Sequence, residues 1–327
     1  MSIKKVVTQF KKVNGFKVLK QYWKLHVFFF VLAQVFLQGT SKKSLEIIRN
    51  AADNKVLNRL RIKYRSEAVR IKQEIDQESY NKIESNQSKK YIWICWFQGI
   101  ENAPDIVKKC VESVKRNTEG REIVFLTNET YPQYIKFPKE IAEKISAGTI
   151  TGAHLSDLIR LELLTRYGGT WIDATVYISD TNYPDYLFNS ELFVFQKLKP
   201  ALDGNPLVLS NWFITSVPNH PILLMTKELL YSYWRRNNYL SHYFVFHMFF
   251  QIAIEYYPDE WRRVIPSSSS TPHILLLKLF EDFDMNIWKG VQNQTSVHKL
   301  SYKFDKELTQ KMDTYYQKIL LDRENTL

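Results

Sequence analysis

The sequence is poor in glycine and cysteine. Only 10 of its 327 residues are glycine, roughly 3% against a usual ~7% in globular proteins. It contains neither the G-x-G-x-x-G pattern of dinucleotide-binding folds nor the G-x-x-x-x-G-K-[ST] pattern of P-loop enzymes. The two cysteines, Cys95 and Cys110, do not form a C-x-x-C pair. This spacing argues against a zinc finger and against a disulfide scaffold.

Acidic residues are scarce in the first quarter of the chain. Residues 1–75 carry 17 Lys and Arg against 4 Asp and Glu, whereas the remaining residues carry 28 and 30. The formal net charge of +11 therefore resides in the N-terminal segment. This asymmetry predicts a basic segment joined to a nearly neutral body. We place the boundary between a helical region, residues 1–88, and a larger domain, residues 89–327.

The N-terminal segment lacks an apolar run long enough to cross a membrane. The run from Leu25 to Leu37 has 13 residues, against the ~20 that a spanning helix needs. No small-residue cleavage site follows it, which argues against a secretory signal. Seven lysines precede it: Lys4, Lys5, Lys11, Lys12, Lys17, Lys20 and Lys24.

Lysines beside Phe and Trp are typical of a helix that lies on an anionic membrane surface. Residues 1–43 therefore suggest a peripheral anchor on the inner, cytoplasmic face of the plasma membrane, and a buried helix with solvated lysines is the alternative. We do not expect nucleic-acid binding, because the aromatic residues form one block instead of interleaving with the basic ones.

The body alternates between apolar runs and helical periodicity. Residues 91–97 and 122–127 are predicted to be buried strands, and Pro104 and Pro138 each open a helix. This β–α–β–α order predicts an α/β fold with a mainly parallel sheet and covering helices. Ligands of such sheets bind at the carboxyl ends of the strands. Before the body, residues 44–80 carry apolar residues at helical spacing and predict a helical extension.

Two charged residues lie on the helix that is predicted after residue 151. Asp157 and Arg160 are three positions apart, so their side chains are neighbours on one face. Gly168 and Gly169 end this helix, and one of them suits a left-handed cap. An ordinary surface ion pair is the alternative interpretation of Asp157 and Arg160.

Residues 170–179 follow the glycines and alternate as a single predicted strand. Asp173 and Thr175 lie on the same face of it. A carboxylate among apolar neighbours is costly unless it is paired or binds a metal. Asp173 is therefore a candidate site residue, and a water-exposed strand edge is the alternative.

These residues form one ordered pattern, Ser156-Asp157-x-x-Arg160-x-x-x-Leu164-x-x-x-Gly168-Gly169-x-Trp171-x-Asp173. The pattern resembles the core motif of glycosyltransferases with a DxD-type sugar-nucleotide site. The nearest resemblance is to the bacterial capsular polysaccharide synthesis glycosyltransferases, which are similar to alpha-mannosyltransferases and to the large clostridial toxin enzymes. An upstream segment, Trp93-x-x-Trp96-x-Gln98-Gly99 followed by Ala103-Pro104 and Cys110, is similar to the same group.

The resemblance implies a GT-A-like, Rossmann-related domain that transfers a sugar from a nucleotide-diphosphate donor. The implied acceptor is a growing, lipid-linked glycan of capsular or exopolysaccharide synthesis, and the implied outcome is retention. Asp157 and Arg160 would contact the donor sugar, and Asp173 the ribose or a metal. The resemblance also implies donor-binding roles for Trp96, Gln98, Ser156, Gly168, Gly169 and Thr175.

A divalent cation, Mn²⁺ or Mg²⁺, is expected because the diphosphate leaving group concentrates negative charge. The sequence departs from the DxD pattern at its second acidic position, which is Thr175. The Thr175 hydroxyl, or a water on the metal, would then replace a carboxylate. No carboxylate is marked by its spacing alone as a nucleophile.

The C-terminal half adds weaker candidates. Asn211 and Trp212 lie in a predicted strand over 206–217 and can line a donor or acceptor pocket, with packing as the alternative and the favoured interpretation of Trp212. In the resembling enzymes a late histidine often completes the metal site beside a basic residue. His298 fits the ligand, and Lys299 or Lys303 fits a contact to the diphosphate.

Three functions compete on these grounds. The leading hypothesis is a glycosyltransferase. The second is a catalytically inactive scaffold of a polysaccharide assembly complex, motivated by Thr175 in place of aspartate. The third is a nucleotidyl- or phosphotransferase that uses the same site.

Overall fold

The computed structural model describes residues 22–80, 90–199, 204–240 and 242–321. The first part of the predicted anchor, residues 1–21, and the predicted domain boundary at 88/89 lie outside these residues.

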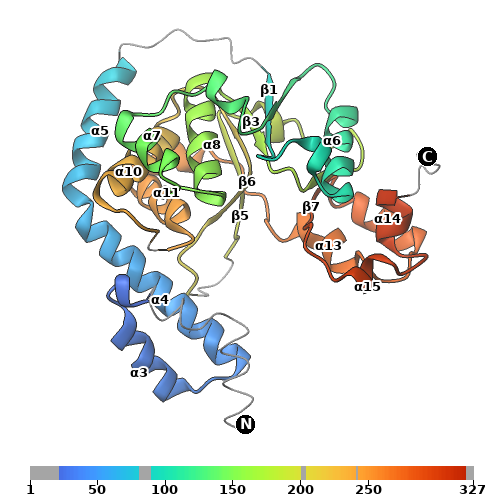
Figure 1. Cartoon of the computed structure of the whole chain (residues 1–327), viewed down its shortest axis with the longest axis horizontal. Coiled ribbons are helices and arrows are strands. Elements are labelled where there is room, and N and C mark those ends of the chain that lie inside the picture. Colours follow the sequence, from blue (N-terminus) through green and yellow to red (C-terminus); the bar gives the residue numbers. More distant parts are fainter. Residues whose placement is uncertain (1–21, 81–89, 200–203, 241, 322–327) are drawn as a thin grey trace.

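A five-stranded sheet forms the centre of the molecule, with the strand order β2-β1-β3-β6-β5 (Figure 1). Its strands are β1 (Tyr91–Cys95), β2 (Glu122–Leu126), β3 (Gly169–Ile172), β5 (Leu192–Gln196) and β6 (Leu209–Ser216). β1 is parallel to β2 and β3, and β6 is antiparallel to both β3 and β5. Four strands therefore share one direction, and the predicted α/β class with a mainly parallel sheet is confirmed.

Both faces of the sheet are buried, which explains why its strands are continuous apolar runs. Trp93 and Trp171 belong to the core on one face, whereas Ile92 and Ile172, their neighbours in sequence, belong to the core on the other. This is the period-two alternation of a strand with apolar layers on both sides.

Helices cover the two faces in separate groups (Figure 1). One group comprises α7 (Lys139–Ser146), α8 (Ala153–Tyr167), α10 (Pro221–Arg236), α11 (Val245–Tyr256) and α12 (Pro258–Arg262). The other side carries α6 (Asp105–Asn117), α9 (Tyr186–Asn189), α13 (Ile274–Lys278), α14 (Met285–Gln292), α15 (Lys306–Thr309) and a small sheet of β4 (Val176–Ile178) and β7 (Val297–Lys299). Three 3₁₀ turns, η1 (Ile100–Asn102), η2 (Tyr131–Gln133) and η3 (Thr271–His273), and a π-helix, η4 (Tyr316–Leu321), complete the described elements.

Between residues 28 and 80 the N-terminal region is helical, as predicted, and comprises three helices. α3 (Phe28–Gln38) packs on α4 (Lys42–Lys63), and α5 (Arg65–Tyr80) packs on α10 (Figure 1). Tyr64 separates α4 from α5, where one helix over 44–80 was predicted. The apolar positions at helical spacing are all buried: Leu57, Leu60, Tyr64, Ala68, Ile71 and Ile75. These helices share one apolar core with the body.

The single strand predicted over 170–179 is wrong. β3 ends at Ile172, and Asp173, Ala174 and Thr175 form a turn before β4. The turn is closed by the Val176 N–H, which donates to the Asp173 carbonyl at 3.0 Å, and the Asp173 N–H donates to the Trp212 carbonyl at 2.8 Å. The chain thereby leaves the main sheet and pairs with β7 instead.

Gly168 and Gly169 join α8 to β3 in left-handed backbone, with φ of +69° and +91°. The Gly168 N–H caps the helix by donating to the Leu164 carbonyl at 3.0 Å, so the predicted glycine cap is confirmed. A Cβ on Gly169 would lie 2.5 Å from the Tyr91 carbonyl oxygen. Gly169 therefore allows β3 to approach β1 closely, and Gly168, where a Cβ would lie 2.9 Å from the Ser216 carbonyl oxygen, allows the junction to approach the end of β6.

We expect Gly169→Ala to destabilise the fold about 2 kcal/mol more than Gly148→Ala, because overpacking adds to a left-handed strain that both share. Gly148 is the matched control, since its φ is +69° and a Cβ there meets nothing within 4 Å. Urea unfolding of the two variants measures the difference. Equal losses of stability would contradict the close approach of Gly169 to β1.

Candidate functional site

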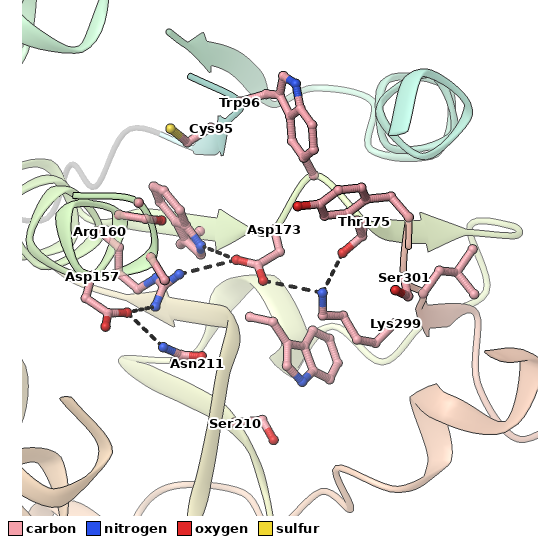
Figure 2. Close-up of a pocket in the computed structure, with 18 of the residues that line it drawn as sticks. Cys95, Trp96, Asp157, Arg160, Asp173, Thr175, Ser210, Asn211, Lys299 and Ser301 are labelled. Atoms are coloured by element: carbon pink, nitrogen blue, oxygen red, sulfur yellow. Dashed lines mark hydrogen bonds and ion pairs between the residues drawn. The ribbon is translucent and has the colours of Figure 1, made fainter. Parts of the chain in front are cut away.

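A cavity of about 890 Å³ opens at the carboxyl ends of β1 and β3 (Figure 2). Its wall is formed by the residues that follow β1, the first turns of α8, the turn after β3, the start of β6 and the segment after β7. The start of β6 reaches this edge because that strand runs against its neighbours. The position agrees with the rule for ligand sites of open α/β sheets.

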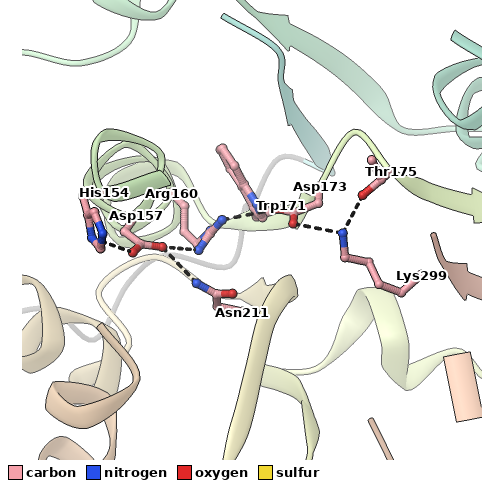
Figure 3. Close-up of polar contacts among 8 residues, drawn as sticks. All are labelled: His154, Asp157, Arg160, Trp171, Asp173, Thr175, Asn211 and Lys299. Atoms are coloured by element: carbon pink, nitrogen blue, oxygen red, sulfur yellow. Dashed lines mark hydrogen bonds and ion pairs between the residues drawn. The ribbon is translucent and has the colours of Figure 1, made fainter. Parts of the chain in front are cut away.

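A row of alternating charges crosses this cavity (Figure 3). Arg160 Nη1 donates to Asp157 Oδ1 at 2.6 Å, and Arg160 Nη2 donates to Asp173 Oδ1 at 3.3 Å. Lys299 Nζ lies 3.4 Å from Asp173 Oδ2 and also donates to the hydroxyl of Thr175. Two residues close together on α8 are thus connected to the turn after β3 and to the end of β7.

Neutral side chains hold the two carboxylates in place. The amide of Asn211 donates to Asp157 Oδ1 at 2.9 Å, and the indole N–H of Trp171 donates to Asp173 Oδ1 at 3.0 Å. The guanidinium carbon of Arg160 lies 4.8 Å from the centroid of the Trp171 ring. Because several partners fix each charged group, the row is preorganised before any ligand enters.

Asp157 and Arg160 are 6% and 3% exposed, which excludes the surface ion pair that the sequence left open. Burial raises the pKa of Asp157 to about 7, opposed by the nearby Arg160 and reinforced by Asp173. The side chain of Asp173 is more open, at 31% exposure. It is therefore the carboxylate of the row that a ligand in the cavity can reach most readily.

Most of the predicted site residues lie together in this cavity. Besides Asp157, Arg160 and Asp173, the lining contains Trp96, Gln98, Ser156, Thr175, Asn211, Trp212 and Lys299. Trp212 also packs, because its ring stacks on Phe195 with a centroid separation of 4.6 Å.

Four predicted residues do not line the cavity. Gly168 and Gly169 lie at the opposite end of β3, where they serve its junction with α8. Lys303 is exposed beyond the lining segment.

His298 is the fourth of these residues and is fully buried beside Lys299 on β7, where side chains of consecutive residues point to opposite sides. Its Nε2 lies 3.2 Å from the Ser179 hydroxyl, and its ring lies 5.4 Å from that of Trp288. The structure therefore places His298 in the core between β4, β7 and α14, away from the cavity.

The lining also contains residues that the sequence did not indicate. Tyr243, Phe244 and His247 come from the segment before α11 and from its first turn, and Lys197 follows β5. Tyr302 meets Trp96 edge to face, with ring centroids 5.1 Å apart. No local pattern marks these residues, because only the packing of distant segments brings them to the cavity.

The donor set in the cavity does not fit a divalent cation well. Among residues 22–80, 90–199, 204–240 and 242–321 there is no group of three or more His, Cys, Asp or Glu arranged to hold a metal. Asp173 and Thr175, the two positions of the DxD pattern, are both contacted by the Lys299 ammonium. A cation beside Asp173 would also meet the Arg160 guanidinium, so like charges would oppose it.

A family model described as capsular polysaccharide synthesis protein matches residues 19–319. The chain belongs to this family. The resemblance inferred from the motif around Asp157 and Asp173 is thereby confirmed.

Curated relatives of this family member match over shorter segments. It is 25% identical to the O-glycosyltransferase braB of Annulohypoxylon truncatum, over 45% of this chain and 38% of that protein. It is 29% identical to the glycosyltransferase afumC of Aspergillus fumigatus, over 30% of this chain and 27% of that protein. The chain thus spans well under half the length of the curated relatives it matches. A solved structure, the PaToxG glycosyltransferase, aligns with 80% of this chain and 96% of its own at 17% identity and a TM-score of 0.38.

We expect His298→Gln to reduce the acid sensitivity of the fold. Burial lowers the pKa of His298 to about 3, so the unfolded chain takes up a proton near pH 6.5 that the folded chain refuses. This difference in pKa does not affect the free energy of unfolding above about pH 6.5. Below that pH it lowers the free energy of unfolding by ~1.4 kcal/mol for each pH unit. Unfolding free energies at pH 7, 6 and 5 should therefore decline less steeply in the variant.

The exposed His26→Gln is the control for this series and should leave the decline unchanged. An unaltered slope in His298→Gln would show that the folded protein protonates this ring readily, contrary to its burial.

Proposed function

We propose that this protein transfers a sugar from a nucleotide-diphosphate donor, bound in the cavity, to a glycan acceptor. The observation that carries the proposal is the preorganised row of Asp157, Arg160 and Asp173 at the carboxyl edge of the sheet. Membership of the capsular polysaccharide synthesis family and the names of the curated relatives support it.

The charges of the cavity suit a diphosphate. Its lining contains three basic side chains, Arg160, Lys197 and Lys299, against two carboxylates, Asp157 and Asp173. Preorganised cations stabilise the negative charge that develops on a leaving diphosphate. The bond between the sugar C1 and the diphosphate oxygen breaks, and the nucleoside diphosphate leaves with the bonding electrons. The acceptor hydroxyl oxygen bonds to C1, and its proton passes to the departing diphosphate.

The side chains of the row contact different parts of the donor. Asp157 and Arg160 hold hydroxyl groups of the donor sugar, since their buried pair presents both acceptors and donors. Asp173 is more open and binds the ribose. Trp96 and Tyr302 form an aromatic wall on which the base or the sugar can pack. The reaction retains the configuration at C1 under this proposal, as the family resemblance implies.

The acceptor in this proposal is a lipid-linked capsular or exopolysaccharide chain, met at the inner face of the plasma membrane. In the part of the chain that the structure describes, no helix is both long and apolar enough to cross a membrane. The surface of α3 supports a peripheral contact instead, because Val31 is buried whereas Phe29, Leu32, Phe36 and Leu37 face outward. Phe36 is 88% exposed.

An inactive scaffold remains the second candidate, because Thr175 replaces the second carboxylate of the DxD pattern. A wild-type protein that binds nucleotide sugars but never turns them over would favour it. Release of pyrophosphate instead of a nucleoside diphosphate would favour the nucleotidyltransferase alternative.

We expect Asp173→Asn to lower turnover at least ~100-fold, because an amide cannot replace the charge shared with Arg160 and Lys299. Release of nucleoside diphosphate from a panel of nucleotide sugars measures it, and circular dichroism checks the fold. Asp259→Asn, which changes an exposed carboxylate on α12, is the control and should leave turnover unchanged. Turnover at the wild-type level in Asp173→Asn would refute the assignment.

We expect the double variant Phe29→Ser/Phe36→Ser to bind anionic vesicles at least ~10-fold more weakly than the wild type, since it loses apolar area that would enter the interface. Co-sedimentation with vesicles of anionic lipid measures the binding. Leu277→Ser/Met312→Ser removes two other highly exposed apolar side chains and serves as the control. Equal binding by the two double variants would exclude α3 as the contact.

A further inference from the structure

The position of Lys299 is fixed by a short strand pair. Lys299 ends β7 and is opposite Val176, the first residue of β4. This register places its ammonium beside the turn of Asp173 and Thr175 (Figure 3). The side chain is only 16% exposed, so its reach into the cavity is defined by packing.

The Lys299 ammonium contacts the two residues that the DxD pattern would give to a metal ion. It lies 3.4 Å from Asp173 Oδ2 and donates to the Thr175 hydroxyl. A threonine at this position can accept that hydrogen bond without adding charge, whereas an aspartate would neutralise the ammonium. An ammonium has three N–H donors, so these two contacts leave one donor for a ligand.

Lys299 also lies where positive charge gathers in the cavity. Arg160 shares Asp173 with it, and Lys197 lines the same cavity. A diphosphate that enters this region meets cations that are already in place. A divalent ion would have to compete with two of them for one carboxylate.

We propose that the Lys299 ammonium takes the place of the divalent cation and binds the donor diphosphate directly, so that donor binding is independent of metal. This inference rests on the proposed function, because it assumes a diphosphate in the cavity. As the bond between C1 and the diphosphate oxygen breaks, the ammonium neutralises the charge that the leaving group gains. Lys299 acts only through its charge and its hydrogen bonds and forms no covalent bond.

Isothermal titration calorimetry with UDP, GDP, CDP and ADP tests the proposal on the full chain. Each nucleotide is titrated in excess EDTA and again with Mn²⁺ or Mg²⁺. We expect at least one nucleotide to bind in EDTA within about threefold of its affinity with metal. Lys299→Met should weaken that binding about ten- to hundredfold, the range for loss of a hydrogen bond to a charged group.

Two further variants serve as controls, one that keeps the positive charge and one outside the cavity. Lys299→Arg retains a cation and should keep the affinity within about fivefold. Lys289→Met removes an exposed lysine of α14 outside the cavity and should change nothing.

Each failure has a different meaning. Binding that requires Mn²⁺ or Mg²⁺ would overturn the inference and leave the proposed function standing. Metal-free binding that survives Lys299→Met would overturn the role of this residue. Failure of every nucleotide to bind under all conditions would contradict the proposed function itself, and the inference with it.

Discussion

The site depends on the two ion pairs that the buried guanidinium of Arg160 forms. The guanidinium connects Asp157 on its own helix with Asp173 in the turn after β3, and Asp173 in turn receives Lys299 from β7. A buried cation is costly unless it is paired, so Arg160 requires both carboxylates to be present and correctly placed. The packing of α8, β3 and β7 therefore determines whether the row forms. The two glycines contribute to this packing, because they let α8 turn into β3 in close contact with the neighbouring strands.

The turn after β3 has a second consequence. Because Asp173, Ala174 and Thr175 leave the sheet, β4 pairs with β7 and brings the C-terminal part of the chain to the cavity. A continuous strand would have kept Thr175 within the sheet and away from Lys299. The departure from a regular strand thus creates the contact between the DxD position and an ammonium group.

Local patterns of the sequence predict the elements that depend on local forces. The apolar runs of β1 and β2, the helical spacing of α6 and α8 and the glycine cap at Gly168 are all in the structure. The proximity of Asp157 and Arg160 follows from their spacing on one helix. The proximity of Asp173 to this pair could be predicted only from the motif as a whole, because Asp173 lies on a different element. Asn211 comes from a third element and was a separate candidate.

Long-range pairing decided what the sequence could not reveal. β5 was not predicted, although its run Leu192-Phe193-Val194-Phe195 is as apolar as that of β1, and only its pairing with β6 shows that it extends the sheet. The register of β7 determines which of His298 and Lys299 faces the cavity, and a shift by one residue would exchange their faces. Tyr243 and Phe244 reach the cavity through the packing of a distant helix. Lys299 was one of two lysines that the sequence offered, and only the strand pair separates it from Lys303.

A crystal structure with a bound nucleoside diphosphate, grown in EDTA, tests the role of the charge row most directly. We expect the phosphate oxygens within hydrogen-bond distance of Lys299 Nζ, with Arg160 still bridging Asp157 and Asp173. A nucleotide bound outside this cavity, or a Lys299 side chain turned away from the phosphates, would contradict the central claim.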